Sequence, residues 1–311
     1  MNWLLSTLFL LTAGLAHAET WRFAVIGDIP YSRHERNEMP RMLENIAAAH
    51  PEFIVHAGDI KMSSDECTDE LFVDRLQLLN SSSAPVIYTP GDNEWTDCRR
   101  LNAGHYDELE RLNKLRTLFF SEPRSLGQRT IAVEQQSVKT PENLRWRLGP
   151  VLFLSLNVPG PNNNFGTGRK PSAEFLARNP ILIEWLKQGF AIARQEHSAG
   201  IVIVMQGNPE FSHFAAGLGH SGYRELLETL LGETLNFPGQ VLLIHGDTHW
   251  HRIDHPLSNR ASGRRVENFT RLETFGYPIM GWAKVIIDSE SPSVFRFESH
   301  AYESGPFPMN R

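Results

Sequence analysis

Residues 53–59, Phe53-Ile54-Val55-His56-Ala57-Gly58-Asp59, form an apolar run that ends in Gly-Asp. Such a run predicts a buried strand that passes into a tight turn, with the carboxylate at the carboxyl end of the strand. The same pattern recurs at residues 23–28, 85–92 and 241–247. In open α/β sheets the ligand site lies at the carboxyl ends of the strands, so these carboxylates should meet there. Their mutual repulsion favours bound multivalent cations, with Asp59 shared between two of them.

Residues 1–18 have the features of a cleavable signal peptide. They contain an apolar run at residues 3–11 and no charged residue apart from His17, and they end in Ala16-His17-Ala18. We expect cleavage after Ala18 and a periplasmic or secreted protein. An uncleaved membrane anchor is the alternative, although the run is short for a span of about 20 residues.

The composition is that of a globular protein, with 311 residues, 41% hydrophobic and 21% charged. The net charge of −6 and the absence of a basic block argue against specific nucleic-acid binding. No other apolar stretch approaches membrane-spanning length, so the mature form is expected to have no membrane span. The two cysteines, Cys67 and Cys98, each follow a Gly-Asp motif, and in an oxidising compartment we expect a disulfide between them rather than a metal site.

Alternating strands and helices in the first half predict right-handed crossovers and a parallel core. The strands expected there are 21–28, 53–59 and 86–88, and the helices are 35–49, 69–80 and 106–120. A second, more antiparallel sheet is expected to contain 131–133, 144–148 and 151–157, followed by strands at 201–205, 241–247, 266–275, 282–288 and 294–299. Further helices are expected from Asn179-Pro180 to Glu196 and over 221–231. We expect one domain, residues 19–311, with two facing sheets and helices outside.

The strand-end motifs Gly27-Asp28, Gly58-Asp59, Pro90-Gly91-Asp92-Asn93-Glu94 and Gly246-Asp247-Thr248-His249 resemble, in order and spacing, those of the calcineurin-like metallophosphoesterases. The resemblance covers nearly the whole mature chain. It implies an α/β fold, a four-layer α/β/β/α sandwich of two facing mixed sheets, with two divalent metal ions.

Several family histidines are absent from this chain. Against the family's motifs, Pro30 replaces the first histidine, Asp92 an asparagine, and Asn93 the neighbouring histidine that often donates a proton or stabilises an oxyanion. Gly207, flanked by Gln206 and Asn208, stands near the fourth-motif histidine. Asp247 replaces the first histidine of the last pair, and His249 remains as the second.

By this resemblance one metal ion is assigned to Asp28, Asp59 and His249. The other is assigned to Asp59, Asp92 and Asp247, assisted by Asn93, Gln206 or Asn208. Oxygen donors suit hard cations, so Mn²⁺, Mg²⁺ or Ca²⁺ is expected in preference to Zn²⁺. Asp59 and Asn93 are the candidate catalytic residues.

Other polar residues have weaker assignments. His56 and His245 are expected to hydrogen-bond inside the sheet, with a ligand role as the alternative. Arg271 and Glu273 are expected to form a surface or sheet ion pair rather than a phosphate clamp. Residues 162–164, all asparagine, form either a turn or a substrate-binding loop. A set of three loop histidines could replace the missing proton donor: His213, His220 and His251.

The resemblance implies a phosphoesterase in which a metal-activated hydroxide attacks phosphorus, and the leader at residues 1–18 predicts that it is exported. The substrate would be a phosphorylated small molecule or a nucleotide, and the choice between monoester and diester stays open. The alternative function is a metal-binding protein of the same fold that has lost turnover. Oxygen-donor replacements at Asp92, Asn93 and Asp247 favour the enzyme, whereas Pro30 and Gly207 favour the alternative.

Overall fold

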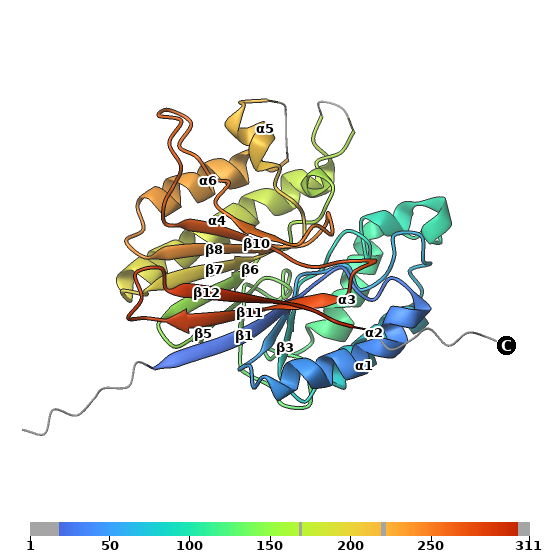
Figure 1. Ribbon diagram of the computed structural model, residues 1–311. Coiled ribbons are helices and arrows are strands. Elements are labelled where there is room, and N and C mark those ends of the chain that lie inside the picture. The colour runs from blue at the N-terminus through green and yellow to red at the C-terminus, as the bar shows by residue number, and fades with distance from the viewer. Residues whose placement is uncertain (1–18, 168–169, 219–221, 304–311) are drawn as a thin grey trace, which may run out of the picture.

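The computed structural model describes residues 19–167, 170–218 and 222–303 and contains two mixed sheets (Figure 1). The five-stranded sheet has the order β12-β11-β1-β2-β3, and the seven-stranded sheet has the order β4-β5-β6-β7-β8-β10-β9. The strands of the first sheet are β1 (Thr20–Ile26), β2 (Ile54–His56), β3 (Val86–Tyr88), β11 (Gly281–Asp288) and β12 (Phe295–Ala301). Those of the second are β4 (Glu134–Gln135), β5 (Leu144–Leu148), β6 (Val151–Ser155), β7 (Gly200–Val204), β8 (Gln240–His245), β9 (Arg252–Asp254) and β10 (Phe269–Glu273).

Both sheets combine parallel strands with antiparallel ones. In the first sheet β1, β2 and β3 are parallel, and β11 pairs antiparallel with both β1 and β12. In the second, β6, β7, β8 and β10 are parallel, whereas β4, β5 and β9 pair antiparallel. The carboxyl ends of the parallel strands therefore define the edge at which the predicted site residues should lie.

Helices cover the outer face of each sheet, as Figure 1 shows. On the side of the five-stranded sheet they are α1 (Arg33–Ala48), α2 (Asp69–Asn80) and α3 (Glu108–Phe119). On the other side they are α4 (Ala173–Gln195), α5 (Phe211–Ala215) and α6 (Arg224–Leu235). Short 3₁₀ turns occur at Asp97–Arg99, Leu101–Ala103 and Asn162–Asn164. The predicted fold class, with two mixed sheets flanked by helices, is confirmed.

Alternate residues of the seven-stranded sheet face two different apolar cores. Val202 and Val204 of β7 pack in the core between the sheets, while Ile201 and Ile203 pack against the outer helices. Across the sheets, the Phe23 and Phe153 rings lie 5.2 Å apart in an edge-to-face arrangement. Burial on both faces explains why the parallel strands appear in the sequence as continuous apolar runs.

The predicted start of the helix at Asn179-Pro180 is wrong. Helix α4 begins six residues earlier, at Ala173, where the Ser172 side chain caps it by accepting from the Phe175 amide at 3.0 Å. Pro180 lies inside the helix and is exposed, so the carbonyl that loses its partner can be hydrated. The strand expected at 131–133 is also displaced, since the short β4 spans Glu134–Gln135.

Within the described ranges, no helix is long and apolar enough to cross a membrane.

Candidate metal centre

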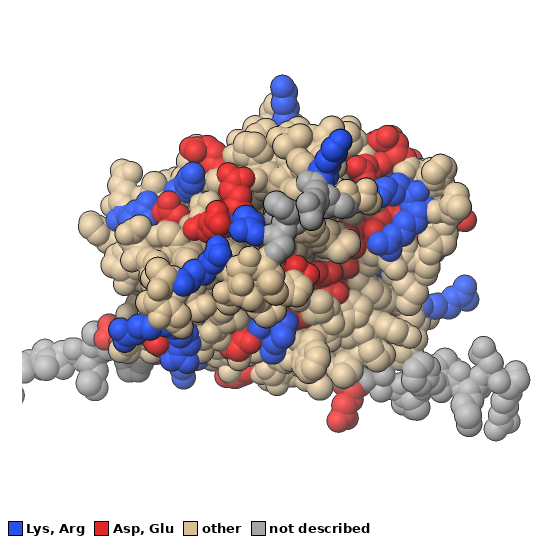
Figure 2. Space-filling model, turned by 90° about the horizontal axis from the view of Figure 1, so that it is seen from above, with Lys and Arg blue, Asp and Glu red and all other residues tan. Residues whose placement is uncertain are grey.

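The predicted site residues follow the carboxyl ends of strands from both sheets. Asp28, Asp59 and Asp92 follow β1, β2 and β3, and Asp247 follows β8. A hydrogen bond of 2.9 Å from the Asp247 amide to Asp28 Oδ1 joins the two sheets at this point. Figure 2 shows acidic side chains gathered in a hollow on one face of the molecule.

The backbone at the site is unusual for residues other than glycine. Asp28, Asp59, Asp247 and His249 have φ angles of 53°, 59°, 81° and 57°. Positive φ is rare outside glycine, and aspartate and histidine are among the residues that tolerate it. Such outliers cluster at functional sites, where the surrounding structure holds them.

Asp28 is fully buried and held by donors from two other segments. Besides the Asp247 amide on Oδ1, the Thr274 hydroxyl donates to Oδ2 at 2.8 Å. A side chain at Gly246 would place its Cβ 2.3 Å from Asp28 Oδ2, so only glycine fits there. Asp28 therefore has a fixed orientation. The Thr274 contact lay beyond the reach of the sequence analysis.

Asp59 is held by Tyr31 and Asn93. The Tyr31 hydroxyl donates to Oδ2 at 2.7 Å, the Asn93 amide N–H donates to Oδ1 at 3.1 Å, and Asn93 Nδ2 donates to Oδ2 at 2.9 Å. Asn93 Nδ2 also contacts the Tyr31 oxygen at 2.8 Å and the Lys61 carbonyl at 3.0 Å. In this arrangement Asn93 orients Asp59, and its predicted catalytic role stays a prediction.

Glu94 ties together the loops that carry Asp59 and Asp92. Its Oε1 accepts from the amides of Asp59 and Gly91 at 3.0 and 2.9 Å and from the Tyr88 hydroxyl at 2.7 Å. The sequence analysis missed Glu94 and Tyr31 as site residues. The signal for Glu94 was its place directly after Asp92 and Asn93. Tyr31 follows Gly27-Asp28 by three residues, which is a weak signal in a single sequence.

The remaining predicted ligands lie on the side of the seven-stranded sheet. The Asn208 amide donates to Asp247 Oδ2 at 2.8 Å, and Gln206 Oε1 accepts from the Gly160 amide at 2.6 Å. Gly207, between them, has no room for a histidine, because a Cβ there would lie 2.5 Å from the Tyr223 hydroxyl oxygen. The side chain of Asn208 accepts from the Glu210 amide at 3.3 Å.

His249 is oriented as a ligand through its Nε2. Its Nδ1 lies 2.8 Å from the Tyr277 carbonyl, which only accepts, so Nδ1 carries the proton and Nε2 is bare in the neutral ring. Nε2 lies 3.8 Å from Asp28 Oδ1. A cation bound between these two atoms would be attracted to both. A histidine held through its other nitrogen is the usual arrangement at metal sites.

The carboxyl groups of the site share raised pKa values. Burial raises the pKa of Asp28, Asp59 and Asp92 well above the usual range, and neighbouring carboxylates raise each further. Asp92 acts on Asp59 in this way, and Asp247 acts on both Asp28 and Asp92. Burial also raises the pKa of Asp247 to about 6. The arrangement concentrates negative charge among largely buried side chains, where solvent screens it less.

The donor set fits divalent cations. Asp92 Oδ1 is buried and has no hydrogen-bond partner among the described residues, and the carboxylates need positive charge to remain ionised. Oxygen donors dominate, with His249 as the imidazole, which matches hard cations. As the side chains stand, the described residues contain no group of three or more His, Cys, Asp or Glu arranged to hold one ion. The predicted ligands thus lie at the junction of the two sheets, but their donor atoms do not converge on one position.

The other sequence predictions have mixed outcomes. His56 Nε2 contacts the Ile29 carbonyl at 2.9 Å and His245 Nδ1 contacts the Gly246 carbonyl at 2.8 Å, which confirms hydrogen bonds inside the sheet. The predicted ion pair of Arg271 with Glu273 is wrong, because each residue has a different partner across the antiparallel β9–β10 ladder. Arg271 pairs with Asp254, and Glu273 accepts from Arg252 Nε at 2.7 Å.

The asparagines at 162–164 form a 3₁₀ turn whose side chains bind the protein itself. Asn163 is buried and contacts the Gly222 carbonyl and Arg178, and Asn164 contacts Glu174 and Arg99. These contacts favour the turn over a substrate-binding loop.

The loop histidines that the structure describes, His213 and His251, have partners outside the predicted ligand set. His213 contacts Glu210 at 3.2 Å, and His251 contacts the Glu273 carbonyl and Ser299. His220 lies outside the described residues. A role for either of the two described histidines as the missing proton donor stays a prediction.

The predicted disulfide between Cys67 and Cys98 is confirmed, with a Cα–Cα distance of 5.7 Å. It joins the loop after Asp59 to the loop after Asp92. Both sulfur atoms lie near the Asn93 carbonyl oxygen, at 3.6 and 3.7 Å. The disulfide therefore supports the segment that orients Asp59.

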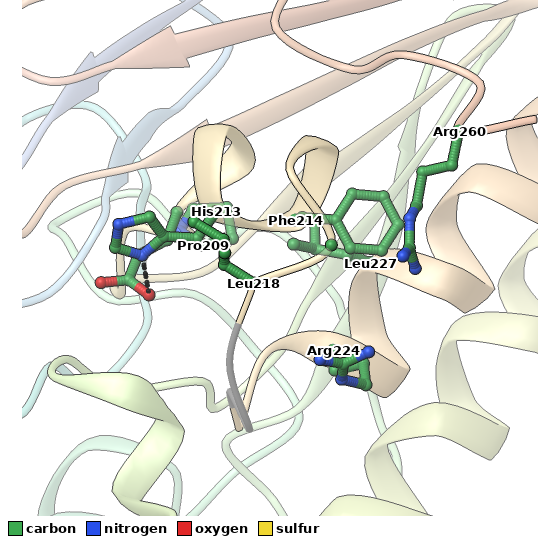
Figure 3. A pocket seen from close by; sticks show the side chains of 9 residues that line it. Pro209, His213, Phe214, Leu218, Arg224, Leu227 and Arg260 are labelled. Carbon is green, nitrogen blue, oxygen red and sulfur yellow. Dashed lines mark hydrogen bonds and ion pairs between the residues drawn. The ribbon is translucent and has the colours of Figure 1, made fainter. Parts of the chain in front are cut away.

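A small cavity lies next to the site, between α5 and the start of α6 (Figure 3). In Figure 3 the Phe214 ring lies beside Arg260, and His213 points toward the Glu210 carboxylate. The cavity has a volume of about 10 Å³, which is room for about one water molecule. It is too small for a substrate.

A model of the calcineurin-like phosphoesterase family matches residues 22–251. The chain therefore belongs to the calcineurin-like phosphoesterase family, whose members typically bind two metal ions. No curated protein matches the chain at a significant level.

Three solved structures share the fold. A dimetal phosphatase from Danio rerio is 12% identical, with a TM-score of 0.52 over 91% of this chain and 99% of that one. PhoD is 14% identical, with a TM-score of 0.52 over 92% and 70% of the two chains. The purple acid phosphatase PPD1 from seeds of yellow lupin (Lupinus luteus) is 12% identical, with a TM-score of 0.52 over 92% and 54%. At these identities the likeness shows the fold alone.

Proposed function

We propose that this protein is an exported, metal-dependent phosphoesterase that hydrolyses phosphate esters. The observation that carries the proposal is the junction of the two sheets, where Asp28, Asp59 and Asp92 are buried with raised pKa values and His249 Nε2 lies 3.8 Å from Asp28 Oδ1. Membership of the calcineurin-like phosphoesterase family supports the same reaction class.

Asp28, Asp59 and His249 would hold one ion, and Asp59, Asp92 and Asp247 the other, assisted by Asn93, Gln206 or Asn208. When bound, divalent ions would activate the attacking water and neutralise charge on the phosphoryl oxygens. The chain itself fixes the donors. Tyr31 and Asn93 hold the Asp59 carboxylate, and Thr274 holds that of Asp28.

The proposed metals are Mn²⁺, Mg²⁺ or Ca²⁺ in preference to Zn²⁺, because carboxylate and amide oxygens dominate the donor set. Turnover, rather than affinity, is the relevant measurement, since Zn²⁺ binds most sites more tightly than these ions do. Asp247→His should shift the preferred ion toward Zn²⁺. A parent that works best with Zn²⁺, together with a variant of unchanged preference, would contradict the assignment of Asp247.

The main experiment uses residues 19–311 after chelation and dialysis. Hydrolysis of p-nitrophenyl phosphate and bis-p-nitrophenyl phosphate is measured with each added metal, alongside bound metal per chain. Asp28→Asn and Asp247→Asn should each lower both metal content and turnover. Asp74→Asn, which changes a carboxylate on α2 that pairs with Arg36 of α1, is the matched control and should lower neither. Turnover that is unaffected by chelation would contradict the proposal.

One observation favours the second candidate, a metal-binding protein without turnover. Both oxygens of Asp59 already accept hydrogen bonds from Tyr31 and Asn93, which leaves less of the carboxylate for two ions. The same experiment separates the two functions. Metal that binds stoichiometrically without hydrolysis of either ester supports this second candidate.

Export is supported by the apolar leader at residues 1–18 and by the disulfide between Cys67 and Cys98. Expression of the full chain with its leader should give a mature protein whose first residue is Glu19. N-terminal sequencing of protein from the culture medium or periplasm tests this. An intact Met1 on cytoplasmic protein would contradict export.

A further inference from the structure

Tyr277 is fixed beside the proposed metal ligands by three contacts. Its amide N–H donates to the Asp28 carbonyl at 3.4 Å, and its own carbonyl accepts from His249 Nδ1 at 2.8 Å. Its ring stacks on the Tyr31 ring, with centroids 6.2 Å apart and an interplanar angle of 21°. These contacts bind the position of Tyr277 to that of the carboxylate cluster.

The backbone at Gly276, next to Tyr277, packs closely against the proposed metal ligands. A Cβ at Gly276 would lie 2.8 Å from both Asp28 Cβ and His249 Cγ, so the backbone passes directly over these two ligands. The Ile279 amide then donates to the Gly276 carbonyl at 3.0 Å and closes a turn. The turn presents Tyr277 and Ile279 at the surface, 39% and 57% exposed.

The two tyrosines form an aromatic path from the centre of the site to solvent. Tyr31 is buried, and its hydroxyl contacts Asp59. Among the described residues, Tyr31 is the one aromatic partner of the Tyr277 ring, whose remaining surface is partly open to solvent. An exposed aromatic ring held rigidly beside a reactive centre has little conformational entropy left to lose when a ligand stacks on it.

We propose that the Tyr277 ring is a stacking platform for the organic part of the substrate, and that the substrate is a phosphoester carrying a planar ring, as in a nucleotide. The inference rests on the proposed function, because the phosphate must sit at the carboxylate cluster. The Tyr31 ring lies between Asp59 and Tyr277. In a nucleotide the sugar lies between the phosphate and the base in the same way. Stacking is tolerant of base identity, since every base has a π-face.

Trp250 is the competing candidate for this platform. It is 72% exposed and directly follows His249. Its amide lies 3.4 Å from Glu273 Oε1, on the side of β10. Within the part of the chain that the structure describes, its ring has no contact with Tyr31 or with a proposed ligand. A freely rotating ring loses more entropy on binding, so Tyr277 is the better platform.

The experiment compares AMP and UMP with ribose 5-phosphate in the metal-loaded protein. These compounds share a primary phosphate ester on the same sugar carbon and differ in the base. The parent should show a kcat/KM about tenfold higher for each nucleotide than for ribose 5-phosphate, through a lower KM, as base stacking predicts. Tyr277→Ala should abolish this ratio and Tyr277→Phe should keep it.

The readout is the ratio of kcat/KM for a nucleotide to kcat/KM for ribose 5-phosphate. Tyr277→Ala can also disturb His249, but the resulting loss of activity would affect all three substrates alike and leave the ratio unchanged. Trp250→Ala is the matched variant and should leave the ratio unchanged. A ratio that is lost in Trp250→Ala and kept in Tyr277→Ala would overturn the inference, as would equal hydrolysis of the three substrates by the parent. If no phosphoester is hydrolysed under any metal, the proposed function itself fails.

Discussion

The carboxylates at the strand ends differ in what holds them. Asp28 and Asp59 each accept hydrogen bonds on both oxygens, whereas Asp92 Oδ1 is buried without a partner. In the metal-free protein Asp92 is therefore the least satisfied member of the cluster. A buried, unpaired carboxylate lowers stability, and residues that serve a function often carry such a cost.

Asp92→Asn should consequently stabilise the metal-free protein, by about 1–2 kcal/mol in the free energy of unfolding, because it removes a charge from a buried like-charge cluster. The same change should reduce the stabilisation gained on adding metal. Urea unfolding in chelator and in excess Mn²⁺ measures both effects. The control is Asp74→Asn, whose carboxylate is paired with Arg36 and Arg75, and which should stabilise under neither condition. A less stable metal-free Asp92→Asn would contradict this account.

Asp59 should matter more to metal content than any other ligand, because it is the one assigned to both ions. Asp59→Asn keeps the shape of the side chain and should lower bound metal toward zero, while Asp28→Asn and Asp247→Asn should each weaken one site. Metal analysis of the dialysed variants checks this. An Asp59→Asn protein with the parent's metal content would show that the carboxylate does not bridge.

His56 should make the fold sensitive to acid. Burial lowers its pKa to about 4, and in the unfolded chain a histidine titrates near 6.5. Below pH 6.5 the unfolded state binds more protons, so this contribution to stability is lost as the pH falls toward 4. Between pH 7 and 5 the parent should lose about 1–2 kcal/mol more than His56→Gln. Urea unfolding at both pH values tests this, with exposed His213→Gln as the control. Equal losses in parent and His56→Gln would contradict it.

At the scale of elements, the disulfide joins the N-terminal side of α2 to the 3₁₀ turn at Asp97–Arg99. Cys67→Ser combined with Cys98→Ser should lower the free energy of unfolding by about 2–4 kcal/mol. It should also lower bound metal, because both sulfur atoms pack at the Asn93 carbonyl. Urea unfolding and metal analysis measure the two losses. Labelling of denatured, non-reduced parent should find no free thiol, and reductant should not change the double variant.

Elements were predictable from the sequence where an apolar run and its flanking turn agree, as at residues 53–59 and 241–247. Arg271 and Glu273 lay close in sequence, but their partners come from β9, a strand whose pairing no local pattern reveals. The start of α4 was missed because Pro180 suggested a boundary, while the Ser172 cap lies in a polar segment. Tyr31 and Thr274 were missed for a related reason, since their site contacts cross sheets or loops far apart in the chain.

At the scale of the whole molecule, metal binding should depend on pH because the carboxylates meet at one junction. The raised pKa of Asp247, about 6, means that the metal-free fold favours its protonated form, and this contribution to stability is lost as the pH rises through 6. An ion must displace that proton. The increase in Tm on adding Mn²⁺ should therefore be small at pH 5 and grow above pH 6. Thermal unfolding from pH 5 to 8 tests this, and an increase that is independent of pH would contradict it.

The position of β11 has a consequence for how the chain folds. This strand, Gly281–Asp288, pairs with β1, Thr20–Ile26. The pairing joins residues that are far apart in the sequence within one sheet. Contacts of such long sequence separation form slowly, because closing the intervening loop costs entropy before the pairing stabilises it. During synthesis β1 has one unpaired edge until almost the entire chain has left the ribosome. A chain that stops before Gly281 would expose that edge permanently and would be prone to aggregate.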